Sequence, residues 1–126
     1  MHFQVGQGVA KLVRCGRGSI VDVVVDLRRG SPTFGQWEAF ELTDKTLHVL
    51  YCPIGFAHGF CVTSEVADVF YKQSAYHDEQ FERGISYADP DVGIRWPELE
   101  LFTSRRDAAA PFLRDISDDL PFVYDG

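Results

Sequence analysis

The sequence predicts an all-β protein that folds as a jelly roll in one domain covering residues 1–126. Short apolar runs rich in β-branched and aromatic residues follow one another at close spacing, and Gly, Pro, Asp and Ser separate them. The chain has 126 residues, of which 45% are apolar, so it is long enough for one core and too short for two ordinary domains. No linker, low-complexity tract or internal repeat interrupts it.

The first strands are expected on either side of a glycine-rich turn. Lys11 to Cys15 forms one strand, Gly16-Arg17-Gly18 turns the chain, and Ser19 to Leu27 forms the next strand. In the second strand Val21, Val23 and Val25 alternate, so they share one face. The two runs together predict a β-hairpin.

Four further strands and two short helical turns follow. The strands are expected within residues 33–42, 46–52, 60–63 and 66–73, between turns at residues 28–32 and 43–45. Helix is scarce: a turn or two is expected at Tyr76 to Glu82, and another at Pro111 to Ile116, near the C-terminus.

Charge and composition exclude several classes of partner. The formal net charge of −7 argues against nucleic acid and anionic membrane surfaces, which require a basic footprint. No apolar run is long enough to span a membrane, and no secretory signal begins the chain, so a cytoplasmic location is expected. Cys15, Cys52 and Cys61 lack C-x-x-C spacing and are expected to be buried, reduced thiols.

An imidazole and a phenol occur in one strand-rich neighbourhood. His58 lies in a loop bounded by Gly55 and Gly59, where backbone and side chain can approach a ligand closely. Tyr71 follows in a strand whose alternation turns it inward with Ala67 and Val69. The pair favours acid–base chemistry at a carbon acid, although a single His in an apolar segment is more often structural. No metal is expected, because no other ligand lies at metal-binding spacing from His58.

Six separated motifs identify a resemblance. They are His2-Phe3-Gln4, Ala10 to Arg14, Val21 to Arg28, Gly30 to Gly35, Gly55 to Phe60, and Asp107 to Pro111, in that order. Together they resemble the dTDP-4-dehydrorhamnose 3,5-epimerase family from His2 to about Pro111. The resemblance implies a metal-free, cupin-like jelly roll that needs no cofactor, forms a homodimer or higher oligomer, and acts on a nucleotide-linked 4-keto-6-deoxyhexose.

The resemblance also implies roles for individual residues. The proton-abstracting His falls on His2, its carboxylate partner on Asp107, and the proton-donating Tyr on Tyr71. The substrate-binding positions fall on Gln4, Lys11, His58, Glu82 and Arg106. Imidazole suits the base because it titrates near neutral pH, and Lys11 with His58 would stabilise the enolate oxygen.

The sequence departs from the family pattern at three places. Family members carry a further segment before the His motif, with Arg-Gly-Leu ahead of the His, whereas this sequence begins Met1-His2. Their paired tyrosines read Tyr76-His77 here, and His77 is as compatible with a solvated side chain as with a ligand. Arg106 stands where Lys is usual, which keeps the charge but changes its geometry.

The resemblance favours an isomerase that epimerises C3, C5 or both of a dTDP-4-keto-6-deoxyhexose. Two alternatives remain at this point. In the first, the chain is an epimerase-like protein with weakened catalysis that binds a sugar nucleotide or a protein partner. In the second, it is an isomerase or cyclase that acts on a carbonyl metabolite without a nucleotide.

Overall fold

The computed structural model describes residues 1–126 and places the strands in two facing sheets. The strands are β1 (His2–Gln4), β2 (Lys11–Arg17), β3 (Ser19–Asp26), β4 (Trp37–Thr43), β5 (Leu50–Cys52), β6 (Phe56–Val62), β7 (Asp68–Gln73) and β8 (Glu82–Gly84). One sheet has five strands in the order β4-β3-β6-β1-β8, and the other has three in the order β5-β2-β7. This arrangement confirms the predicted all-β jelly roll.

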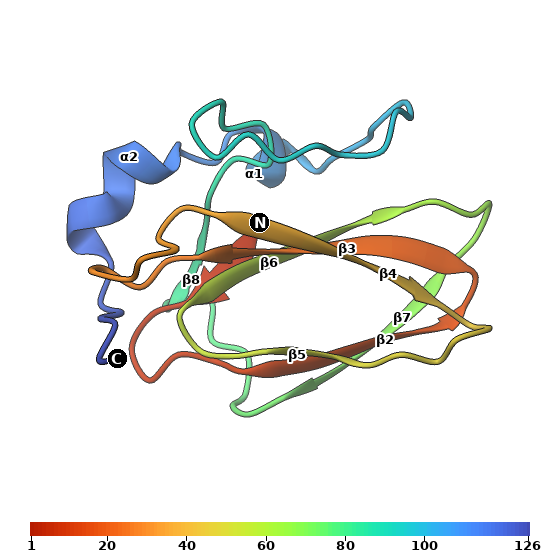
Figure 1. Ribbon diagram of the computed structural model, residues 1–126, viewed down its shortest axis with the longest axis horizontal. Helices are drawn as coiled ribbons and strands as arrows, with labels where there is room; N and C mark the ends of the chain where they lie inside the picture. Colours follow the sequence, from red (N-terminus) through yellow and green to blue (C-terminus); the bar gives the residue numbers. More distant parts are fainter.

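The C-terminal segment covers the outer face of the five-stranded sheet. It carries α1 (Arg105–Ala108), α2 (Leu113–Ile116) and a 3₁₀ turn (Ser117–Asp119), so the helix expected at residues 111–116 is present. Figure 1 shows the five-stranded sheet between this segment and the three-stranded sheet. No helix of the chain is long and apolar enough to cross a membrane.

Two hydrophobic clusters fill the faces of the five-stranded sheet. The smaller lies between the sheets and comprises Val13, Cys15, Ile20 and Leu42. The larger lies under the C-terminal segment and comprises Met1, Phe3, Val23, Val25, Leu27, Ala57, Ile85, Val92, Leu113, Leu120 and Phe122. Val21 packs against the larger cluster, which confirms the expected common face of Val21, Val23 and Val25. Each fully buried Val, Leu or Ile contributes roughly 1.5–3 kcal/mol of transfer free energy.

The predicted hairpin between β2 and β3 is wrong. β2 pairs with β5 and β7, while β3 pairs with β4 and β6, so the turn at Gly18 carries the chain from one sheet to the other. Gly18 has a φ of +81°, and a Cβ there would lie 2.1 Å from the carbonyl oxygen of Val66. The glycine-rich break therefore serves a tight crossing, and both edges of β3 are taken by other strands.

The helical turn expected at residues 76–82 is also wrong. A turn closed by the Phe81 amide, which donates to the Asp78 carbonyl at 3.0 Å, leads directly into β8. β8 pairs with β1, in a register that places Gly84 opposite His2 and Glu82 opposite Gln4. Pairing with a strand far away in the sequence thus overrides local helix propensity.

Three other strands, β4, β5 and β6, begin at residues different from those expected. The strand expected from Thr33 begins at Trp37, since Thr33 donates its hydroxyl to Asp26 at 2.6 Å. The strand expected within residues 46–52 is confined to Leu50–Cys52, and the one expected from Phe60 begins at Phe56.

Asp26 is a buried anchor at the end of β3. Its carboxylate accepts hydrogen bonds from the Arg28 backbone and guanidinium, and from the hydroxyls of Ser31 and Thr33. Burial alone would raise the pKa of Asp26, but these donors outweigh it and hold the pKa far below its ordinary value. The loop at residues 28–35 is therefore fastened to the sheet by one ionised group.

We expect Asp26→Asn to lower the free energy of unfolding by about 2–4 kcal/mol at pH 7, because donors then face an amide. A lowered pKa means that the stabilisation is full above the unfolded value of 3.8 and is lost as the pH falls below it. Urea unfolding monitored by Trp fluorescence should show the largest loss at pH 7 and a smaller one below about pH 3. A pH-independent difference would contradict this assignment.

Candidate active site

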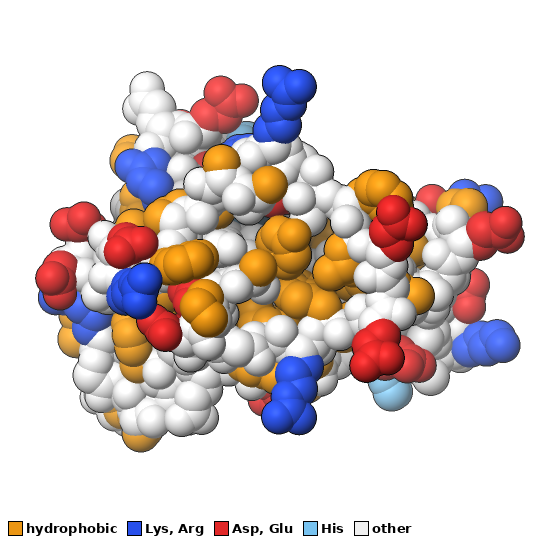
Figure 2. All heavy atoms as spheres, turned by 90° about the horizontal axis from the view of Figure 1, so that it is seen from above, with side chains coloured by type: hydrophobic (Ala, Val, Ile, Leu, Met, Phe, Trp, Pro, Cys, Tyr) orange, Lys and Arg blue, Asp and Glu red, His pale blue; other side chains and the backbone are white.

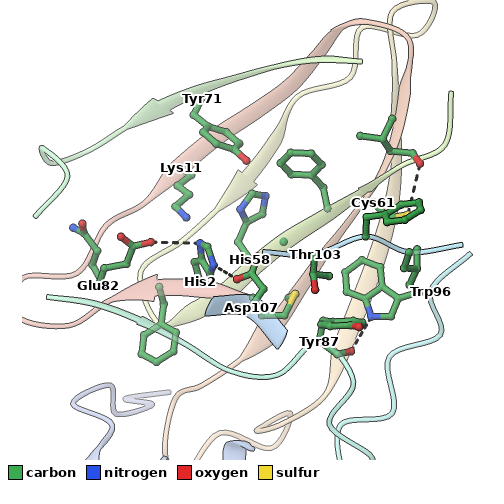
Figure 3. A pocket seen from close by; sticks show the side chains of 18 of the residues that line it. His2, Lys11, His58, Cys61, Tyr71, Glu82, Tyr87, Trp96, Thr103 and Asp107 are labelled. Carbon is green, nitrogen blue, oxygen red and sulfur yellow. Dashed lines mark hydrogen bonds and ion pairs between the residues drawn. The ribbon is translucent and has the colours of Figure 1, made fainter. Parts of the chain in front are cut away.

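One cavity collects most of the residues predicted for the site. It has a volume of about 610 Å³, within the size range of small-molecule sites. Strands of both sheets and the 96–103 segment line it. Figure 2 shows the face that carries the C-terminal segment, where apolar side chains gather in a central hollow with charged groups around it. Figure 3 shows the cavity from close by.

His2 and Asp107 form a pair at one side of this cavity. His2 is held in β1 between β6 and β8, and its Nε2 lies 2.5 Å from Oδ1 of Asp107. Asp107 lies in α1, whose N-cap Ser104 accepts a hydrogen bond from the Asp107 amide at 3.1 Å. Partial burial opposes ionisation of Asp107, but the hydrogen bond and charge of His2 lower its pKa overall. The carboxylate therefore fixes the orientation of the imidazole.

The second nitrogen of His2 faces another carboxylate. Nδ1 of His2 lies 3.4 Å from Oε1 of Glu82, which is farther than an ordinary hydrogen bond. With Nε2 engaged by Asp107, Nδ1 remains to accept a proton from a substrate. Glu82 also contacts His77 and Arg106. Arg106, predicted to bind substrate, does not itself line the cavity but contacts Glu82, which does.

His58, which lines the cavity, forms a second His–Asp pair with Asp22, and this pair was not identified in the sequence. Nε2 of His58 on β6 lies 2.7 Å from Oδ2 of Asp22 on β3, and both side chains are buried. Burial raises the pKa of Asp22, while the hydrogen bond and charge of His58 oppose that rise. Oδ1 of Asp22 has no hydrogen-bond partner. The signal was present, because an Asp inside an otherwise Val-rich buried strand requires a partner.

Lys11 and Tyr71 reach the cavity from the three-stranded sheet. Burial lowers the pKa of Lys11, while the charges of Cys52, Glu82 and Asp22 oppose that effect. Tyr71 shares its strand face with Val69, as predicted, and its ring stands edge-to-face with His58 at 5.6 Å between centroids. Burial, with the charge of Asp22, raises the pKa of Tyr71, so its phenol stays protonated at neutral pH.

These groups lie on two sides of one cavity. Figure 3 shows Tyr71 on the side opposite His2 and Asp107, with Lys11 and His58 between them. A base, a protonated phenol and a cationic group around one cavity are the components needed to remove a proton next to a carbonyl and to return one.

The remaining predicted residue, Gln4, also lines the cavity. Its Oε1 accepts a hydrogen bond from the Asp78 amide at 3.0 Å, which ties β1 to the loop before β8. The other end of the cavity is apolar and was not predicted from the sequence; it is lined by Phe60, Cys61, Val62, Trp96, Leu99, Leu101 and Phe102. Cys15 and Cys52 are buried as expected, whereas Cys61 is only partly buried.

Comparison with known proteins gives one consistent family. The family model of dTDP-4-dehydrorhamnose 3,5-epimerase matches residues 1–115. The dTDP-4-dehydrorhamnose 3,5-epimerase of Salmonella typhimurium is 45% identical over 115 residues, which cover 90% of this chain and 63% of that protein. The Pseudomonas aeruginosa enzyme of the same name is 46% identical over 97 residues, which cover 77% and 54%.

Two solved structures of epimerases have the same fold as this chain. The dTDP-6-deoxy-D-glucose-3,5-epimerase of Legionella pneumophila, in complex with dTDP-4-keto-L-rhamnose, matches with a TM-score of 0.94 and 42% identity, over 99% of this chain and 67% of that chain. A 4-keto-6-deoxy sugar epimerase from the novobiocin biosynthetic gene cluster of Streptomyces spheroides gives a TM-score of 0.92 and 42% identity, over 96% and 62%.

The chain spans less than two thirds of the length of the first curated relatives, 63% and 64%. Within that span, the family model covers nearly the whole sequence, and the fold agrees with the solved relatives over almost all of it. The chain therefore belongs to the dTDP-4-dehydrorhamnose 3,5-epimerase family.

Proposed function

We propose that this protein is an isomerase that epimerises a dTDP-linked 4-keto-6-deoxyhexose at C3, C5 or both. The observation that carries the proposal is the placement of the His2–Asp107 pair and the protonated Tyr71 on opposite sides of one cavity. The Legionella pneumophila relative, which binds dTDP-4-keto-L-rhamnose, supports the substrate class.

The proposed first step is proton removal next to the C4 ketone. Nδ1 of His2 takes the proton from C3 or C5, and the electron pair of the broken C–H bond forms the enolate. Asp107 stabilises the resulting imidazolium through Nε2. Lys11 and His58, both lining the cavity, stabilise the negative charge that develops on the C4 oxygen.

The second step returns a proton from the other side. The Tyr71 hydroxyl donates its proton to the opposite face of the same carbon, so the configuration inverts and the ketone is restored. The tyrosinate then regains a proton from water, and His2 releases its own. Epimerisation by this route is not a redox reaction, because no electrons pass to or from another molecule. The absence of a cofactor or metal stays a prediction.

Exchange in D₂O tests this function. The protein is mixed with dTDP-4-keto-6-deoxyglucose, and ¹H NMR and mass spectrometry follow deuterium at C3 and C5. We expect exchange at one or both carbons together with the epimerised product. Binding without exchange would support the alternative of a sugar-nucleotide binding protein, and turnover of a smaller ketone without binding of the dTDP-sugar would support the other alternative.

We also propose that the protein forms a homodimer or higher oligomer. The outer face of the three-stranded sheet exposes Leu12, Tyr51 and Phe70, whose register places them on one side of β5, β2 and β7. Light scattering after size exclusion should give a multiple of the 14.2 kDa chain mass. A monomer at that mass would contradict this proposal.

The cytoplasmic location stays a prediction.

A further inference from the structure

The carboxylate of Glu82 is shared by residues from three parts of the chain. Oε1 lies 3.4 Å from Nδ1 of His2 and 3.3 Å from a guanidinium nitrogen of Arg106. Oε2 lies 3.2 Å from Nε2 of His77, in the loop between β7 and β8. The Glu82 side chain is only 12% exposed, whereas those of His77 and Arg106 are 52% and 57% exposed. A largely buried anion is thus held from outside by two more exposed cationic or donor groups.

The two oxygens of Glu82 have different tasks in this arrangement. His77 contacts Oε2 at ion-pair distance, while Oε1 faces both His2 and Arg106. Asp107 already fixes the other nitrogen of His2. The imidazole of His2 consequently lies between two carboxylates, and the second of them is contacted by both His77 and Arg106.

We propose that His77 is a positioning residue that holds Glu82 toward His2, and that protonation of His77 sets how strongly Glu82 favours the imidazolium form of His2. This inference rests on the proposed function for its effect on rate, but not for its effect on the two imidazoles. His77 lines the cavity beside Glu82, and the role assigned to it acts through the Glu82 carboxylate.

Several other charged groups surround this network. They are Lys11 on β2, Arg106 and Asp107 on α1, Asp78 next to His77, Arg83 on β8, Glu100 in the 96–103 segment and the amino group of Met1. Arg83 donates to the carbonyl oxygens of Gln80 and Glu82, so it does not compete for the Glu82 carboxylate. An arginine guanidinium does not lose its charge in proteins, so the contact of Arg106 is not a source of pH dependence. Among the groups in contact with the Glu82 carboxylate, His2 and His77 are the two imidazoles, the side-chain type that can gain a positive charge in mild acid.

The sign of the coupling follows from these contacts. Neutral His77 leaves the negative charge of Glu82 free to stabilise the imidazolium of His2. Protonated His77 forms an ion pair with the same carboxylate and offsets that charge, so it opposes protonation of His2. In acid, the wild-type protein therefore keeps more of its His2 in the proton-accepting form than a protein without a titrating group at position 77.

Two substitutions distinguish the effect of the His77 contact on Glu82 from the effect of the charge on His77. His77→Gln keeps an N–H donor for Glu82 but never carries a charge, and His77→Phe keeps a ring but no donor. For His77→Gln we expect the acidic limb of the pH profile of kcat/KM to shift to higher pH by about half a unit. The shift should be smaller at 1 M salt, which screens the charge. For His77→Phe we expect kcat at pH 8 to fall by about tenfold, because Glu82 is no longer held. His48→Gln, at an exposed His outside the cavity, is the matched control and should leave the limb unmoved.

A measurement without substrate makes the inference independent of the function. NMR titration of the histidine ring protons should show the His2 signals responding in two steps in wild-type protein and in one step in His77→Gln, since coupled groups titrate together. A single, identical His2 titration in both proteins would overturn the inference even if the protein epimerises its substrate. The two-step response without any turnover would instead keep the coupling and refute the proposed function.

Discussion

His2→Asn is expected to slow both epimerisation and deuterium exchange by about 100- to 10,000-fold. Asparagine approximates the size of the imidazole and can still bond to Asp107, but it offers no nitrogen that accepts a proton at neutral pH. The measurement is deuterium incorporation into dTDP-4-keto-6-deoxyglucose by ¹H NMR. Binding of the dTDP-sugar, followed by calorimetry, should change far less than the rate.

Tyr71→Phe should separate exchange from inversion. The variant keeps the base and the groups that stabilise the enolate, so His2 can still remove a proton and return a deuteron to the same face. We expect inversion to fall by at least about 100-fold while exchange with retention persists at a reduced rate. Equal loss of exchange in both variants would assign Tyr71 to enolate stabilisation, and full inversion by Tyr71→Phe would remove it from the mechanism.

The all-β fold could be predicted because the chain repeats one local signal. Short runs of Val, Phe, Tyr and Trp between turn residues are typical of strands, and six of the eight strands lie within or beside the expected ranges. The partners of the strands were harder to predict. The turn at Gly18 has the composition of a hairpin, yet β2 and β3 lie in different sheets, since crossing and hairpin turns both use glycine.

The three-residue strands β1 and β8 escaped prediction for a related reason. Neither has enough residues to show alternation, and each is stabilised by pairing with a strand about 80 positions away in the sequence, as Gln4 with Glu82. Their pairing nevertheless builds the site, because it brings His2 and Glu82 together. The sequence alone, without the family resemblance, would have assigned His2 to a frayed terminus.

The residues of the candidate site were also predictable only in part. The resemblance pointed to His2, Tyr71 and Asp107, and the structure brings all three to one cavity. Asp22 and the Glu82–His77 contact were missed because each depends on which side chains meet across strands. An Asp within a Val-rich strand indicates that some partner exists but does not say which one.

The remaining large effect is expected at Asp22, the buried partner of His58. Asp22→Asn keeps the shape and a carbonyl acceptor for Nε2 of His58 but removes the negative charge that favours the imidazolium. The variant no longer favours a second proton on the ring, so under the proposed mechanism an N–H at Nδ1 is less available to the enolate oxygen. We expect kcat to fall by about 100- to 1,000-fold, the usual cost of one lost oxyanion donor, with a smaller change in KM.

Stability should move in the opposite direction to activity, which separates a catalytic defect from misfolding. Burial holds the pKa of Asp22 above its ordinary 3.8, so the stability supplied by the neutral carboxyl is full below that pH and is lost as the pH rises through the folded value. Asparagine is neutral throughout, so Asp22→Asn should gain stability relative to wild type between pH 4 and pH 7 in urea unfolding. Asp22→Ala, which leaves His58 without its buried partner, should lose about 3–5 kcal/mol. A loss of activity in Asp22→Asn that tracks a loss of stability would show that the pair supports folding alone.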